Sequence, residues 1–447
     1  MTERLKNIPA NRKALPSTAT VAFGAKILSI YSAVVVALLM AGAARAQQPG
    51  DKWLADAERK QFERLRDEGS AALYNLDYAT ARADFSELVR LFPQHPAGPQ
   101  YLATALLVET LYNSRRLQSS LFSTGSSFYS KGEDKADPNV VKQFEALTGD
   151  ARRLAEARLK QYPNDTEALY FLGNTAALKA SFEETVERRH MAALSDGSEA
   201  VGLHRRAVAL DPAFLDSQVT IGLYDYIVGS LPFPVKLLAG AFGAHGSKKR
   251  GLATIERVAK EGRLARDQAQ TLLVVLYTRE KRYGEAAERA RQLSARYPRN
   301  YLYRIEAADA LISQAAAAGK ADRASAGGDI AGEAFAIYEA LLHDKGVAGA
   351  AARMKDLIHF KYGEALMKVG HTERAAAEFL AAARTEGAGE ELTTMAHLQA
   401  ARALEASNNH AEAATQYRLV LSRPDVYDAH AEARKGLGEV AGRKQTR

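Results

Sequence analysis

Cysteine is absent from all 447 residues, and tryptophan occurs only once. The absence of thiols excludes disulfide bonds, thiol catalysis and a lipid-modified N-terminal cysteine. A chain of this length without cross-links must draw its stability from buried apolar surface. Since 47% of its residues are hydrophobic, the chain can build a large core.

Patterns that carry chemistry are also missing. The sequence has no His-Glu-x-x-His pair, no Gly-x-Ser-x-Gly turn and no phosphate-binding glycine loop. We interpret His190 and His204 as solvated helix histidines, because a converging third ligand is missing. The acidic stretch "SFEETVERR" (181–189) pairs Glu with Arg at helical spacing, which is typical of a solvated face. We therefore predict no catalytic residue, no metal and no cofactor.

An excess of positive charge is nearly absent once the chain is divided. The formal net charge is +7, but residues 1–46 hold six Lys/Arg and one acid. The other 401 residues therefore carry only +2. Because phosphate binding needs concentrated Lys and Arg, the sequence does not favour a nucleic-acid partner.

The N-terminus has the pattern of a secretory signal peptide. Basic residues precede an uncharged apolar run over 27–43, and Ala44-Arg45-Ala46 follows. Small residues at −3 and −1 predict cleavage after Ala46, with export to the periplasm. A retained membrane anchor is the alternative, since the run approaches the ~18 residues that a span requires.

A repeated pattern follows. In "KRYGEAAERARQLSARYPRN" (281–300), aromatic, small and apolar residues form one stripe on a short helix that ends at proline. The same offsets recur in "LDYATARADFSELVRLFPQHP", "VGHTERAAAEFLAAARTEG" and "NNHAEAATQYRLVLSRPD". A small residue often lies twelve positions earlier, as Gly69 precedes Ala81 and Gly363 precedes Ala375.

These residues resemble the tetratricopeptide repeat (TPR), whose unit of ~34 residues is a pair of antiparallel helices. The resemblance implies an all-α fold, a right-handed α-solenoid of TPR-like helix pairs. We expect a lead-in over 47–61, about eight pairs over 62–424, and a capping helix and tail over 425–447. Insertions are expected at 118–139 and 315–329, and "SDGSE" (195–199) is expected to end a long first helix.

The stretch "GLYDYIVGSLPFPVKLLAGAFGAHGSKK" (222–249) interrupts the pattern with glycine and proline. We expect a helix over 216–228, a packed turn and a helix over 249–260. Residues 221–259 also resemble a segment of a eukaryotic TPR family linked to protein inclusions and lipid droplets. That resemblance implies a scaffold without a substrate.

The TPR resemblance implies that the first helix of each pair lines a concave groove. The groove positions are Tyr170, Asn174, Leu223, Tyr226, Thr271, Arg279, Asp309, Phe360, Glu364 and Lys368. Family members that bind chaperones hold a terminal carboxylate with Lys and Asn. Here Asn174 matches, but Tyr170 stands where the Lys would be, which puts carboxylate capture in doubt. A mixed aromatic and charged groove suits an extended peptide or a partner helix.

We therefore predict an exported, non-enzymatic scaffold that binds a protein or peptide in the cell envelope. One alternative is a membrane- or lipid-associated protein. It would use an apolar loop over 231–242 made of Leu231, Phe233, Val235, Leu237, Leu238 and Phe242, with Lys236, Lys248 and Lys249. The least favoured alternative is an enzyme whose carboxylates converge from distant repeats.

Overall fold

The computed structural model describes residues 53–114, 117, 136–234, 236–237, 245–318, 326–343 and 354–445. These residues form seventeen α-helices, one π-helical turn and one 3₁₀ turn, and they contain no strand. No helix among them is long and apolar enough to cross a membrane. The expected signal peptide, residues 1–46, lies outside the described part of the chain.

The helices follow one another with short connections. They are α2 (Asp56–Tyr74), α3 (Tyr78–Leu91), α4 (Ala97–Asn113), α6 (Pro138–Gln161), α7 (Thr166–Phe182), α8 (His190–Leu210), α9 (Gln218–Gly229), α11 (Lys248–Glu261), α12 (Arg266–Arg279), α13 (Tyr283–Arg296), α14 (Tyr301–Ala318), α15 (Ala326–His343), α16 (Lys355–Lys368), α17 (Thr372–Arg384), α18 (Glu390–Ala406), α19 (His410–Leu421) and α20 (Ala429–Gln445). The π-turn η3 (Glu183–Glu187) extends α7, and the 3₁₀ turn η4 (Leu215–Ser217) precedes α9.

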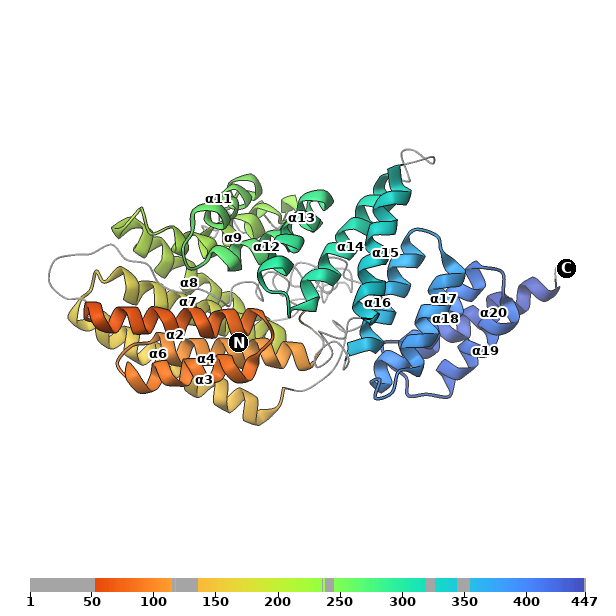
Figure 1. Ribbon diagram of the computed structural model, residues 1–447, viewed down its shortest axis with the longest axis horizontal. Helices are drawn as coiled ribbons and strands as arrows, with labels where there is room; N and C mark the ends of the chain where they lie inside the picture. The colour runs from red at the N-terminus through yellow and green to blue at the C-terminus, as the bar shows by residue number, and fades with distance from the viewer. Residues whose placement is uncertain are drawn as a thin grey trace, which may run out of the picture.

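Each helix packs mainly against the next along the chain, so the described helices form eight successive pairs, from α2–α3 to α18–α19, with α20 at the end. Figure 1 shows α2 to α13 gathered in one half, α14 and α15 standing between, and α16 to α20 running away from them. This arrangement confirms the predicted all-α, TPR-like solenoid.

The repeated small and aromatic residues meet inside the pairs as the TPR pattern requires. A Cβ on Gly69 of α2 would come within 2.5 Å of the Phe85 ring on α3. Gly363 of α16 and Phe379 of α17 would come within 2.7 Å in the same way. Because glycine lacks the Cβ, the aromatic ring of the second helix can lie directly on the backbone of the first. The local pattern thus sets how each pair packs.

The first half of the solenoid closes on itself. Tyr74 at the end of α2 stacks on Tyr297, with ring centroids 4.7 Å apart and planes inclined by 16°. The Asn300 side-chain amide donates to the Tyr74 carbonyl at 2.7 Å. Arg299 pairs with Asp77 at 3.1 Å. These residues are more than two hundred positions apart, so the closure joins the first helix pair to α13 and α14.

The glycines of the stretch 222–249 let α9 and α11 cross closely. A Cβ on Gly251 would lie 2.4 Å from both the Gly222 oxygen and the Tyr226 nitrogen. A Cβ on Gly229 would lie 2.0 Å from the Lys248 nitrogen. The two backbones therefore touch where side chains would normally separate them. The stretch is first of all a tight crossing within one helix pair.

Two predicted boundaries are wrong. "SDGSE" (195–199) does not end a helix but lies inside α8, which begins at His190. The preceding helix ends sooner, at η3 and at Arg188, whose φ is 59°. Inside α8, Asp196 pairs with Lys179 at 2.9 Å, so a contact with α7 outweighs weak local helix propensity. The expected loop at 315–329 is shorter, since α14 reaches Ala318 and α15 begins at Ala326.

Candidate partner-binding surface

Five of the ten predicted groove residues are core residues. Their side chains leave at most 7% of their surface exposed, and they are Tyr170, Asn174, Leu223, Tyr226 and Phe360. All lie on first helices, which are enclosed on nearly every side. In α7, for example, every residue from Ala168 to Phe182 except Lys179 is buried. This corrects the expectation that Tyr170, Asn174, Tyr226 and Phe360 face a partner, because side chains of neighbouring helices pack around them. Leu223 is buried as well, but it borders a small cavity between α7, α8 and α9.

Their neighbours explain the burial. The Tyr170 ring packs on Phe214 and edge-on to His204. The Tyr226 hydroxyl donates to Glu280 at 2.6 Å. Phe360 meets Phe379 edge-on at 5.3 Å. Since Tyr170 and Asn174 are both enclosed, the place where the family holds a carboxylate is not an open surface in this protein.

The other five groove residues keep accessible surface. Thr271 and Arg279 are half-buried on α12, and the Thr271 hydroxyl lies 3.1 Å from that of Tyr303. Asp309 on α14 is half-buried, while Glu364 and Lys368 on α16 are exposed. The structure brings the last three together in one polar cluster between α14 and α16. They remain candidates for contact with a partner.

Lys361 organises this cluster, although the sequence pattern did not single it out. Its ammonium lies 3.0 Å from a Glu364 oxygen and 3.7 Å from an Asp309 oxygen. The Tyr338 hydroxyl also donates to Asp309. Burial alone lowers the pKa of Lys361, but the carboxylates of Glu364 and Asp309 outweigh burial and raise it. Lys361 is therefore a fixed cation that holds two carboxylates in place.

Lys368 lies two turns further along the same face of α16 as Lys361, but its contacts differ. Its ammonium donates to the Ser313 hydroxyl at 2.7 Å rather than to a carboxylate. Burial lowers the pKa of Lys368, and the nearby charge of Lys361 lowers it further. The two exposed ends of the cluster, Glu364 and Lys368, thus offer one acceptor and one donor of opposite charge. Such a surface can hydrogen-bond an extended peptide or a polar helix face.

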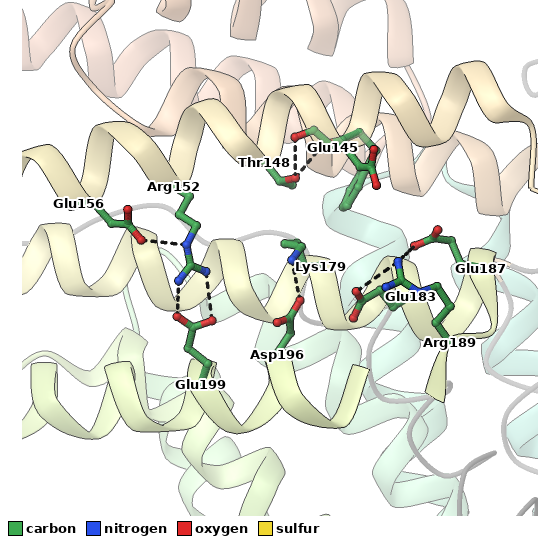
Figure 2. Close-up of polar contacts among 11 residues, drawn as sticks. Glu145, Thr148, Arg152, Glu156, Lys179, Glu183, Glu187, Arg189, Asp196 and Glu199 are labelled. Carbon is green, nitrogen blue, oxygen red and sulfur yellow. Dashed lines mark hydrogen bonds and ion pairs between the residues drawn. The ribbon is translucent and has the colours of Figure 1, made fainter. Parts of the chain in front are cut away.

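A second polar region lies on α6, α7 and α8 (Figure 2). Arg152 forms a bidentate pair with Glu199, at 2.6 and 3.1 Å, and also contacts Glu156. Lys179 pairs with Asp196 at 2.9 Å. These bridges tie three helices from two consecutive pairs into one unit.

The acidic stretch 181–189 is not a solvated face. Glu183 and Glu184 are only 5% and 4% exposed, because the π-turn η3 rotates them inward after α7. Burial raises the pKa of Glu183, and Asp196 raises it further. Arg189 lies 3.8 Å from the Glu183 carboxylate (Figure 2). π-helical turns occur often at functional sites, so this segment is a second candidate.

His204 also corrects the sequence reading, because it is fully buried, whereas the His190 side chain is 44% exposed. Neither ring nitrogen of His204 has a hydrogen-bond partner among the described residues. Its imidazole lies against the backbone of Gly173, where a Cβ would approach within 2.8 Å. Burial lowers the pKa of His204 to about 3. The ring is therefore a neutral core group.

This burial predicts a pH dependence of stability. An unfolded histidine titrates near ~6.5, so below that pH the unfolded chain takes up a proton that folded His204 rejects. Stability should then fall with pH by up to about 1.4 kcal/mol per unit down to the folded pKa. Denaturant unfolding at several pH values should show that the free energy of unfolding of His204→Leu falls less steeply toward acid pH than that of the parent protein. The exposed-site variant His343→Leu should keep the parental slope, and equal slopes in both variants would contradict the assignment.

No group of three or more potential metal ligands gathers anywhere in the described ranges. Sequence reasoning missed Lys361, Ser313 and Tyr338 in the α14–α16 cluster. The only local signal was the Lys361–Glu364 spacing, which joins two residues of one helix face. The contacts of Lys361 with Asp309 and of Lys368 with Ser313 cross from one helix pair to the next, and no spacing in the sequence records them.

No protein-family profile matches the chain, and no curated protein matches it in sequence. Solved structures with similar helices include a human IFIT1 dimer with m7Gppp-AAAA, at 12% identity over 94% of this chain and 86% of that one, with a TM-score of 0.43. A tetratricopeptide repeat protein from Parabacteroides merdae aligns at 13% identity over 75% and 99%, with a TM-score of 0.29. The P58(IPK) TPR domain aligns at 15% identity over 86% and 99%, with a TM-score of 0.21.

Proposed function

We propose that this TPR-like α-solenoid is a scaffold that binds a protein or peptide, and that it does so after export to the cell envelope. The α14–α16 cluster carries the proposal. It presents Glu364 and Lys368, of opposite charge, on α16, the helix that begins the extended run α16 to α20 (Figure 1). The buried Lys361 ammonium holds the Glu364 and Asp309 carboxylates in place. A pre-ordered surface of this kind loses little side-chain entropy when a partner binds.

Charge reversal tests the surface. Lys368→Glu should place a second acid beside Glu364 and weaken partner binding at least tenfold, because truncated or inverted interface charges cost several kcal/mol. The matched control is Lys435→Glu, an exposed lysine on α20 away from the cluster. Binding to a partner captured by photo-crosslinking at Glu364 can be measured by surface plasmon resonance. Equal affinity of the two variants would contradict the assignment of the cluster.

The export part of the proposal rests on the N-terminal sequence: basic residues, the apolar run 27–43 and Ala44-Arg45-Ala46. N-terminal sequencing of the protein from the cell envelope should read Gln47 first. Cytoplasmic full-length protein would count against export. Protein that begins at Met1 and is found in the membrane fraction would favour the retained anchor.

A second candidate function, membrane contact, has one observation in its favour. Phe233 and Leu237 are 79% and 66% exposed, and they lie four residues apart in the segment after α9. Val235, Leu238 and Phe242 of the same predicted loop lie outside the described residues. Membrane contact would be favoured over the scaffold if a photo-crosslinker at Phe233 labelled only lipid and a photo-crosslinker at Glu364 labelled no protein.

A further inference from the structure

A cavity of about 70 Å³ lies between α7, α8 and α9. Its walls are mostly apolar and include small residues, among them Ala177 and Ala180 of α7 and Ala193 of α8. Leu223 and Ile227 of α9 form the opposite side. The gap exists because four alanines, Ala200 included, and Gly197 line it, where larger side chains would have filled the space.

The cavity can be reached from the surface. Ser198 on its rim is exposed, and Leu194 and Tyr224 on the same rim are half-buried. The Arg205 guanidinium stacks over the Tyr224 ring at 5.0 Å and holds it at the edge. A group on another molecule can therefore enter without unfolding a helix.

The size of the cavity limits what fits. A cavity of ~150 Å³ with apolar walls holds a benzene ring, and this one has about 70 Å³. A branched aliphatic group of a few carbons matches that volume. An aromatic ring or an extended acyl chain does not. The occupant that the volume favours is one leucine, isoleucine or valine side chain.

The electrostatics of the wall exclude an anionic ligand. Glu184 lines the cavity with its side chain only 2% exposed, and its carboxylate lies 2.8 Å from His190 Nδ1. Glu183, beside it, is also buried, and Arg189 is the cation nearest to that carboxylate. A fatty acid or phospholipid head group would meet buried carboxylates and lose its hydration. A neutral polypeptide would not meet that repulsion.

The π-turn is what brings Glu184 to the wall. It continues α7 as a wider turn, and the Arg189 amide donates to the Glu183 carbonyl at 2.7 Å. Arg188 then takes a positive φ of 59°, which costs free energy for a residue that is not glycine. The segment thus combines a cavity, a buried carboxylate and an irregular backbone at one place.

We propose that this cavity is an anchor pocket for one branched aliphatic side chain of a partner polypeptide. The pocket is on α7–α9, apart from the α14–α16 cluster, and the proposal stands without that cluster. A side chain that fills a well-packed pocket contributes strongly to protein recognition when the surrounding contacts exclude water, and an aliphatic side chain can serve as such an anchor. The chain would then hold its partner through a second point of attachment.

The test uses N-acetyl-leucinamide as the probe, with titration followed by methyl NMR of the full chain. We expect saturable shifts of the Ala180 and Ala193 methyl groups, with millimolar affinity. Gly197→Leu should reduce affinity at least tenfold, because a Cβ at this position has only the Ala180 methyl nearby, at 3.9 Å, and the side chain would fill the pocket. Gly202→Leu is the matched control, since it lies on the same helix with nothing within 4 Å.

Equal affinity of the Gly197→Leu and Gly202→Leu variants would overturn the proposal. Tighter binding of hexanoate than of N-acetyl-leucinamide would also overturn it and indicate a lipid site. Tighter binding of N-acetyl-phenylalaninamide would contradict the size argument. If Gly197→Leu does not fold, the smaller Gly197→Ala should still weaken the probe severalfold, and thermal unfolding identifies which variants are folded. None of these readouts depends on the α14–α16 cluster.

Discussion

Tyr74→Ala is expected to lower the free energy of unfolding by about 3–5 kcal/mol, the range for removing a large buried aromatic side chain. Tyr74 is 4% exposed and stacks on Tyr297, so the substitution removes both the buried area and the ring–ring contact. The contact joins the first helix pair to α13. The variant should therefore loosen the closure of the N-terminal half as well as the local core.

Urea unfolding gives the stability change, and hydrogen exchange shows where it acts. Amides of α2 and of the α13–α14 connection should exchange faster, while those of α17 to α19 should keep their protection. The control is Tyr74→Phe. The Tyr74 hydroxyl is buried without a hydrogen-bond partner in the described residues, so its removal should be neutral or slightly stabilising. A similar loss for both variants would show that the hydroxyl, and not the stack, matters.

Gly251→Ala is expected to lower the free energy of unfolding by about 1–3 kcal/mol, the range for overpacking. The added methyl would meet backbone atoms, namely the Gly222 oxygen and the Tyr226 nitrogen, both at 2.4 Å. Backbone cannot rotate away as the end of a flexible side chain can. α9 and α11 would have to separate, and the Asp225–Arg250 ion pair between them would be strained.

The control for this prediction is Gly202→Ala in α8. Nothing lies within 4 Å of a Cβ there, so alanine should stabilise the helix by roughly 0.5–1 kcal/mol. Thermal and urea unfolding of the two variants should thus change in opposite directions. A Gly251→Ala protein as stable as the parent would show that the crossing is looser than the structure indicates.

Local sequence patterns were sufficient for the helix pairs. Gly69 and Gly363 were recognised from their position twelve residues before Ala81 and Ala375, and each glycine lies against an aromatic ring of the following helix, Phe85 or Phe379. This works because the partner helix follows within a few residues, so a periodic stripe records which face packs on it. Five of the ten predicted groove residues, including Asp309, Glu364 and Lys368, keep accessible surface, and their role in binding stays a prediction.

The burial of first helices could be decided only by the tertiary structure. A stripe of apolar residues predicts one buried face, but α7 is covered nearly all round, so Tyr170 and Asn174 face the core. The sequence pattern also predicts solvated side chains at Glu183, Glu184 and His204, and all three are buried. Their neighbours lie in the same α7–α8 pair, at Arg189, His190 and Gly173, but the π-turn that places the two acids inside leaves no periodic signal in the sequence.

The sequence by itself therefore determined the helices, their pairing and the small residues at each crossing, since these depend on contacts between residues close in the chain. The tertiary structure alone decided the closure through Tyr74 and Tyr297, the Lys361 cluster and the cavity beside Gly197. These depend on how successive pairs curve, which is the sum of many small packing angles. A change of a few degrees per pair would move such distant residues apart, and for that reason the pattern in the sequence cannot reveal them.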